Sequence, residues 1–225
     1  MHDQPSKLVL LLVVLAISSL LFGVGVVTPA LAEIAKAFEN WTVEVCEAEF
    51  METTCRRNLD TTLEAYQRIL WGSMADAEAC ARLGALCGGG STSEVEALAG
   101  FGRRLGFMYR IADDMKDTLN AEGNLPDRLE RESVPLPILY TAKFSKENYS
   151  KVKTVLDKQR ATPSDVKELL KLCFETEAFA YAYKLAKQNK LEMRQKLRLL
   201  KPSEARNVLS LMAKKAFEDV DSLCL

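Results

Sequence analysis

The chain has 225 residues, and its 30 lysines and arginines nearly balance its 31 aspartates and glutamates, giving a formal net charge of −1. This length is enough for one good-sized hydrophobic core. Because there is no basic excess, a nucleic-acid partner is not expected.

The cysteine pattern excludes two classes of small, crosslinked domain. The six cysteines form no CxxC pair and have no companion histidine except His2, so a zinc site is not expected. A disulfide framework needs a smaller secreted chain with denser cysteines. Cys46, Cys80, Cys87 and Cys173 have apolar neighbours, and we expect them to be buried thiols in a reducing, cytoplasmic compartment.

The chain opens on a long apolar stretch, with no ionisable side chain between Lys7 and Glu33. Three interpretations are open. Residues 30–32 resemble a signal peptidase site, the stretch is long enough to span a bilayer, and a helix over Leu8–Val27 could instead be buried inside a bundle. The weak basic region before it argues against a signal peptide, and the glycines and proline in its second half argue against a span.

The remainder of the chain predicts an all-α fold, because apolar residues recur every three or four positions between turn signals. The expected helices run from Pro29 to about Cys55, over Leu63–Leu86, from Glu94 to about Thr118, from the prolines near Leu136, over Ser164–Lys190 and over Pro202–Ser222. No repeat or linker divides residues 1–225, so a single domain is expected.

Several of these helices carry start and stop signals. Residues 60–62 are expected to cap the helix that begins at Leu63, and the glycines at 88–90 are expected to end it. Ser93 is expected to cap the next helix, with Glu96 completing a capping box.

Three acids lie together near the end of that next helix. Asp113 and Asp117 are four residues apart and share a helix face, and Asp114 lies beside them. The C-terminal end of a helix has a negative dipole, so each carboxylate there costs roughly 0.3–1 kcal/mol unless a cation compensates. Mg²⁺ is one candidate cation. The alternative is a solvated helix end that is neutralised by Arg110 and Lys116.

A longer motif surrounds the trio. It includes LGAL at 83–86, EVEAL at 94–98, FGR at 101–103, LGF at 105–107, IADDMKD at 111–117 and LPI at 136–138. With these residues in register, residues 80–141 resemble the second half of a trans-isoprenyl diphosphate synthase of the polyprenyl synthetase family. A weaker resemblance extends over most of the chain.

The resemblance implies an isoprenoid-synthase-type helical bundle around a central cavity. It implies Mg²⁺ as cofactor, with Asp113, Asp114 and Asp117 as metal ligands, and Arg110 and Tyr109 as substrate-binding residues. The implied substrates are an allylic diphosphate and isopentenyl diphosphate, and the implied assembly is a homodimer or a heterodimer with a related synthase. Inside such a bundle the opening stretch is expected to be a core helix, so a membrane is not an expected partner.

The sequence departs from the family at positions that serve the chemistry. The first aspartate-rich motif is expected before the opening helix, so either the native protein begins earlier or half of the metal site is missing. Other family positions are altered: Ser73-Met74 replaces a lysine-threonine pair, Ala48-Glu49 a glycine-glutamine pair, Arg110 a glutamine, Tyr109 a phenylalanine, and Ser133 a lysine. The two replaced lysines would each bind a diphosphate through an ammonium group. Without them the chain lacks two charge-assisted interactions that are worth roughly 1.5–3 kcal/mol each.

Arg110 has two interpretations. It could replace a missing lysine as a phosphate ligand, or it could lie against Asp114 and occupy the space of a metal ion. We expect the pairing with Asp114, because Asp114 lies four residues after Arg110 on the same helix and is always present, whereas a phosphate ligand has to bind first.

Three functions follow from the sequence, in descending order. The first is a magnesium-dependent prenyltransferase that condenses an allylic diphosphate with isopentenyl diphosphate and releases pyrophosphate. The second is a catalytically impaired family member that serves as a helical partner subunit of an active synthase. The third is a membrane-anchored helical protein, which depends on the opening stretch alone.

Overall fold

The computed structural model describes residues 29–120 and 123–223, and within them the chain is all-helical. An isolated antiparallel bridge joins Arg56 to Ser133. The helices are α2 (Pro29–Thr54), α3 (Leu63–Gly72), α4 (Ala75–Cys87), α5 (Thr92–Leu119), α6 (Leu125–Arg131), α7 (Leu136–Phe144), α8 (Lys146–Leu156), α9 (Pro163–Glu175), α10 (Ala178–Arg198) and α11 (Glu204–Asp221). The all-α prediction is confirmed, and the predicted opening helix lies outside the described residues.

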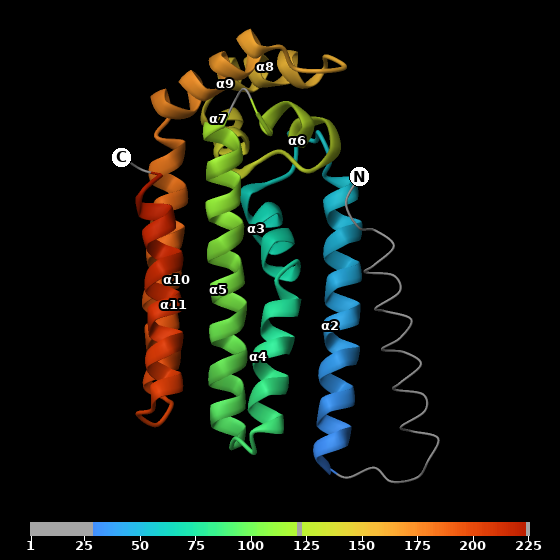
Figure 1. Cartoon of the computed structure of the whole chain (residues 1–225). Coiled ribbons are helices and arrows are strands. Elements are labelled where there is room, and N and C mark those ends of the chain that lie inside the picture. Colours follow the sequence, from blue (N-terminus) through green and yellow to red (C-terminus); the bar gives the residue numbers. More distant parts are fainter. Residues whose placement is uncertain (1–28, 121–122, 224–225) are drawn as a thin grey trace.

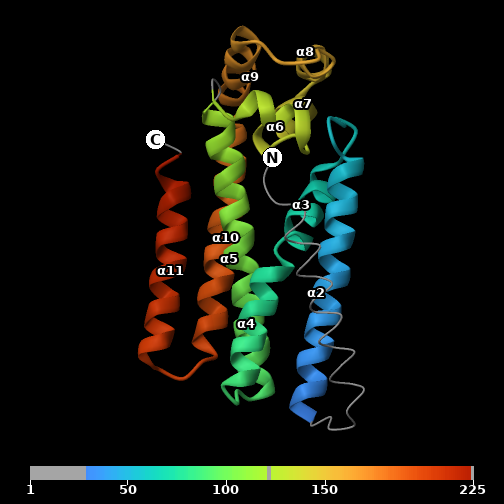
Figure 2. The same cartoon turned by 45° about the vertical axis from the view of Figure 1, so that its right-hand side comes forward.

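Helix α5 is the central element of the bundle. It runs between the α10–α11 hairpin on one side and α3 and α4 on the other, with α2 beyond α4 (Figures 1 and 2). Its small residues permit this close packing, since a Cβ added at Gly102 would lie 2.4 Å from the carbonyl oxygen of Ala77 in α4. Met74 similarly lies against Gly106.

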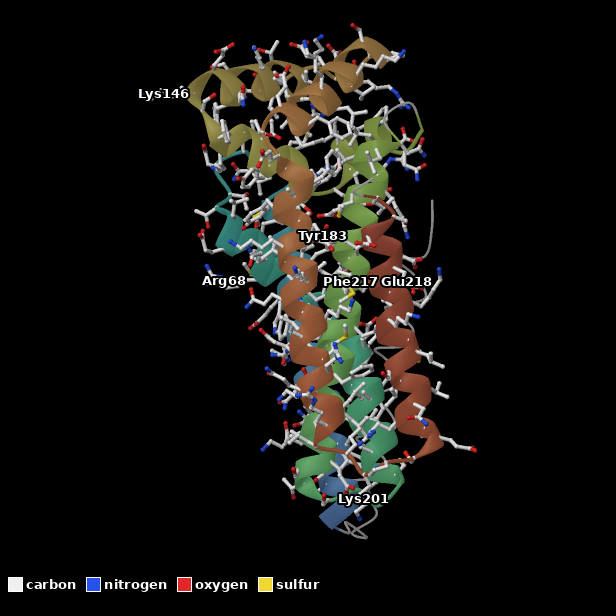
Figure 3. All side chains as sticks on the ribbon, turned by 90° about the vertical axis from the view of Figure 1, so that its left-hand side faces the viewer. Arg68, Lys146, Tyr183, Lys201, Phe217 and Glu218 are labelled. Carbon is white, nitrogen blue, oxygen red and sulfur yellow. The ribbon has the colours of Figure 1, made fainter. Side chains whose placement is uncertain are left out.

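The other side of α5 is covered by the last two helices. In Figure 3 Tyr183 of α10 and Phe217 of α11 face each other, with ring centroids 5.6 Å apart. Their apolar contacts belong to a cluster of buried side chains that draws on α3 and on α5 to α11. The short helices α6 to α9 gather over one end of the long helices (Figure 1).

Two helices predicted as continuous are each broken in the structure. The helix expected over Leu63–Leu86 is interrupted at Ser73 and Met74, where the backbone N–H of Ser73 bonds to the carbonyl of Ile69 and its hydroxyl bonds to Leu70. The helix expected over Ser164–Lys190 is broken at Glu177, which has a left-handed φ of 57°. A non-glycine residue in this conformation gives no sequence signal.

The helix starts agree with prediction at one site and differ at another. Thr62 caps α3 as expected, through its bond from the N–H of Ala65. The cap of α5 is Ser91 rather than Ser93, and its capping-box partner is Glu94 rather than Glu96. Ser91 and Glu94 are separated by the same three residues as Ser93 and Glu96, so the sequence pattern of a capping box fits both pairs. The prediction chose the later pair.

Burial of the cysteines was predicted too broadly. Cys173 is buried, but Cys46, Cys80 and Cys87 are exposed. An apolar neighbourhood in sequence does not identify the buried face of a helix. None of the helices in the described part of the chain is long and apolar enough to cross a bilayer.

Candidate functional site

Among the three acids at the end of α5, Asp114 is the most deeply buried and accepts the most hydrogen bonds. It is fully buried and accepts bonds from the hydroxyl of Tyr66 at 2.7 Å, the backbone N–H of Leu136 at 3.0 Å and Nη2 of Arg128 at 2.7 Å. These donors come from α3, from the start of α7 and from α6. Asp114 therefore joins four helices at one point.

Tyr66 acts in this network as a neutral donor. Its ring is fully buried, and burial together with the nearby charge of Asp114 holds the pKa of its hydroxyl well above the ordinary value. The proton therefore stays on Tyr66, available to Asp114.

Arg128 is the cation that pairs with two acids of the trio, Asp114 and Asp117, and the sequence did not identify it. It is 6% exposed, and besides Asp114 it bonds Asp117 through Nη1 at 2.5 Å and forms an ion pair with Glu132, whose carboxylate lies 2.8 Å from Nε. Burial alone would lower the pKa of Arg128, but the surrounding acids, Asp114 foremost, raise it above its ordinary value. Its position between Leu125 and Leu129, both buried on α6, was a usable signal.

Asp113 faces away from this network. Its side chain is 53% exposed, and Lys116 is 4.0 Å away. Partial burial raises the pKa of Asp113, against the opposing effect of Lys116. The three acids thus have different surroundings, with Asp114 inside, Asp117 paired and Asp113 outside.

A polar cavity of about 290 Å³ lies next to the trio, between the end of α2, α5 and the end of α6. Its lining contains three arginines and three glutamates: Glu49, Glu52, Thr53, Arg56, Arg110, Arg131 and Glu132. Arg56 donates to the carbonyl of Glu130 at the cavity's edge.

Arg110 lines this cavity and does not pair with Asp114 as expected. Its nearest acid is Glu52, at 3.6 Å, and its buried Nε has no hydrogen-bond partner. Asp114 is already fully occupied by its three donors, which explains why the expected i to i+4 pair does not form.

The other altered positions divide between the cavity and the core. Ser133 is buried and donates to Glu52 at 3.0 Å, so it lies next to the cavity. Ala48 is buried against Gly72, whereas Glu49 lines the cavity. Tyr109, predicted to bind substrate, is 39% exposed and is not among the cavity residues.

The contacts of the trio do not fit a magnesium ion. In residues 29–120 and 123–223, no group of three histidine, cysteine, aspartate or glutamate side chains is arranged to hold a metal. Both oxygens of Asp114 have protein donors, and Asp117 is paired with Arg128. The ligand role expected for Asp113, Asp114 and Asp117 stays a prediction that these contacts do not favour.

A family model and curated relatives agree on the family of this chain. The family model described as polyprenyl synthetase matches residues 8–173. A short chain isoprenyl diphosphate synthase of Methanothermobacter thermautotrophicus is 26% identical over 177 residues, which are 76% of this chain and 54% of that protein. Heptaprenyl diphosphate synthase component 2 of Bacillus subtilis is 28% identical over 178 residues, covering 76% of this chain and 50% of that protein.

Solved structures agree in fold. Geranylgeranyl pyrophosphate synthetase from Pyrococcus horikoshii is similar, with a TM-score of 0.73 and 24% identity over 85% of this chain and 60% of that chain. Geranylgeranyl pyrophosphate synthase from Lactobacillus brevis has a TM-score of 0.75 and 18% identity, over 83% of this chain and 59% of that chain. The chain spans about half the length of the curated relatives it matches.

Proposed function

The chain belongs to the polyprenyl synthetase family, and we propose that it binds a diphosphate in its arginine-lined cavity and takes part in prenyl transfer. In that reaction the C–O bond of an allylic diphosphate breaks and pyrophosphate leaves with the electron pair. The double bond of isopentenyl diphosphate attacks the allylic carbon, and loss of a proton completes the longer prenyl diphosphate. The family assignment supplies this chemistry, and the cavity supplies a place for the charged group.

The loose pairing of Arg110 is the observation that carries the proposal. Arg110 lines the cavity, its ion pair with Glu52 is 3.6 Å long and so beyond hydrogen-bond distance, and its Nε has no hydrogen-bond partner, so its charge is available to an anion in the cavity. Guanidinium groups also suit phosphate oxygens better than ammonium groups do, because their donors form a planar fork. Arg110 and Arg131 could therefore bind the diphosphate in place of the lysines that family members carry where this chain has Ser73 and Ser133.

The glutamates of the cavity do not fully cancel the attraction of its arginines for a diphosphate. Glu132 is paired with Arg128, and Glu52 accepts a hydrogen bond from Ser133 and forms only a loose ion pair with Arg110. A diphosphate entering the cavity would compete mainly with the 3.6 Å contact between Arg110 and Glu52, which is longer than a hydrogen bond.

A second candidate is a partner subunit that supports an active synthase. The pairing of Arg128 with Asp114 and Asp117 favours it, because two carboxylates already paired with a side-chain cation are less available to a catalytic metal. The relative from Bacillus subtilis is by its name one component of a synthase, which also supports this candidate.

One experiment tests both candidates. The purified chain is incubated with labelled isopentenyl diphosphate and a set of allylic diphosphates, alone and mixed with a family synthase of known product. Product from the chain alone, reduced at least about tenfold by Arg110→Gln, supports prenyl transfer in this cavity. Arg198→Gln, an exposed change on α10, is the control that leaves turnover unchanged.

The other outcomes are equally informative. No product alone, but an altered product length in the mixture, supports the partner subunit. No product, no effect on the second synthase and no bound diphosphate would reject both candidates.

A further inference from the structure

We propose that the Arg128 guanidinium takes the place of a divalent cation at the acidic end of α5, so that the trio in this chain binds no Mg²⁺. The proposal rests on the contacts of the trio and stands whether or not the chain transfers prenyl groups. It departs from what family membership leads one to expect of these residues.

The bonding of Arg128 is the first argument. Two of its guanidinium nitrogens donate to acids of the trio, Nη2 to Asp114 and Nη1 to Asp117. Its Nε lies 2.8 Å from the carboxylate of Glu132 as an ion pair, without a well-directed hydrogen bond. The planar fork suits this arrangement, in which one cation bridges several carboxylates as a metal ion would.

The occupancy of Asp114 is the second argument. Its Oδ1 accepts from Arg128, and its Oδ2 accepts from both Tyr66 and the N–H of Leu136. A metal ion at Asp114 would have to displace Arg128 or break the contact of α5 with α3 and α7. Asp113 alone is open to solvent, and a single carboxylate with water ligands is a weak magnesium site.

The anchoring of α6 is the third argument. Leu125 and Leu129 flank Arg128 at i−3 and i+1, and they are 0% and 3% exposed in the core. Because these leucines pack α6 against the core, the guanidinium of Arg128 is held in place by a helix and not by a mobile loop. Arg128 is therefore a permanent counter-ion to the negative end of α5.

The test measures metal binding without any turnover. Thermal unfolding and titration calorimetry of the wild-type chain are run in EDTA and in millimolar Mg²⁺ or Mn²⁺. The proposal predicts no binding heat and the same midpoint in each buffer. A trio site filled at a hundred times its dissociation constant would instead raise the midpoint by roughly 5–10 °C.

Arg128→Gln provides the gain-of-binding arm. Removal of the guanidinium leaves Asp114 and Asp117 without a cation, so the variant should unfold at lower temperature in EDTA and recover several degrees in Mg²⁺. Arg198→Gln, an exposed change on α10, is the control and should show no metal response.

Three results would overturn the proposal. The first is wild-type magnesium binding that Asp117→Asn abolishes. The second is a folded Arg128→Gln variant with no response to metal, since Arg128 would then not hold the place of a cation. If Arg128→Gln does not fold, Arg128→Met, which also removes the charge but keeps an apolar stem, is measured in its place: its recovery in metal supports the proposal, and a folded Arg128→Met without recovery is the third contrary result. A failed turnover assay would leave all these readouts intact, so the proposed function and this inference can fail separately.

Discussion

At the scale of single residues, the network around Asp114 combines what the sequence could reveal with what it could not. The sequence identified Asp114 and its neighbours, because their spacing along a helix is local information. The donors to Asp114 come from positions 14 to 48 residues away. The spacing of Leu125 and Leu129 could have indicated that Arg128 lies on a buried helix face, but nothing local identifies Asp114 and Asp117 as its partners.

Truncation of Arg128 should be among the most damaging single changes in the chain. Arg128→Met leaves Asp114 buried without its cation, and the loss of one partner from a buried pair costs about 3–5 kcal/mol. Urea denaturation measures the free energy of unfolding. Arg131→Met, which removes an exposed guanidinium three residues later, should change it by no more than about 0.5 kcal/mol. A decrease below about 1 kcal/mol in Arg128→Met would mean that the network contributes little.

The cysteines should divide by reactivity. Burial raises the pKa of Cys173 to about 12, so almost no thiolate exists at pH 8. Iodoacetamide at that pH should modify the exposed Cys46, Cys80 and Cys87 and leave Cys173 unmodified until the chain is unfolded. Mass spectrometry of the digested protein reads each site separately. Rapid modification of native Cys173 would contradict its burial.

At the scale of elements, the sequence predicts where helices lie better than where they break. The bounds of α2 and the start of α3 are close to those predicted, because a proline and a threonine cap mark them. The short helices α6 and α8 were missed, since each is too brief for its periodicity to stand out. The breaks at Met74 and Glu177 depend on tertiary contacts and on one left-handed residue.

The two serines that compete to cap α5 give a clean test of its start. Ser91→Ala removes the observed capping box with Glu94 and should cost about 1 kcal/mol of unfolding free energy. Ser93→Ala, inside the first turn, should change it by less than about 0.5 kcal/mol. Equal effects of the two substitutions, measured by chemical denaturation, would contradict the assigned cap.

Two helical glycines should respond oppositely to the same change. Gly102→Ala places a methyl group 2.4 Å from the carbonyl oxygen of Ala77, so α4 and α5 must separate, at a cost of about 1–3 kcal/mol. Gly84→Ala meets nothing within 4 Å and removes a flexible residue from α4, which should stabilise the chain by roughly 0.5–1 kcal/mol. Melting temperatures of the two variants should therefore shift in opposite directions. A neutral Gly102→Ala would show that the two helices are not in close contact.

At the scale of the whole molecule, family membership and chemistry can be separated. The fold agrees with that of solved relatives at TM-scores of 0.73 and 0.75, although only 24% and 18% of residues are identical. The resemblance in sequence therefore predicted the architecture correctly. Sequence reasoning expected an arginine against Asp114 but assigned that place to Arg110, whereas Arg128 holds it. Such a pairing changes the site while leaving the packing of the bundle intact.

We propose above all that this molecule binds a diphosphate through Arg110 and Arg131, beside two carboxylates, Asp114 and Asp117, that are already paired with Arg128. Calorimetric titration with inorganic pyrophosphate, in EDTA and again in Mg²⁺, tests this claim directly. We expect similar affinity in both buffers and a decrease of about tenfold or more in Arg110→Gln. Binding that requires Mg²⁺, or that is unchanged in Arg110→Gln, would contradict the account.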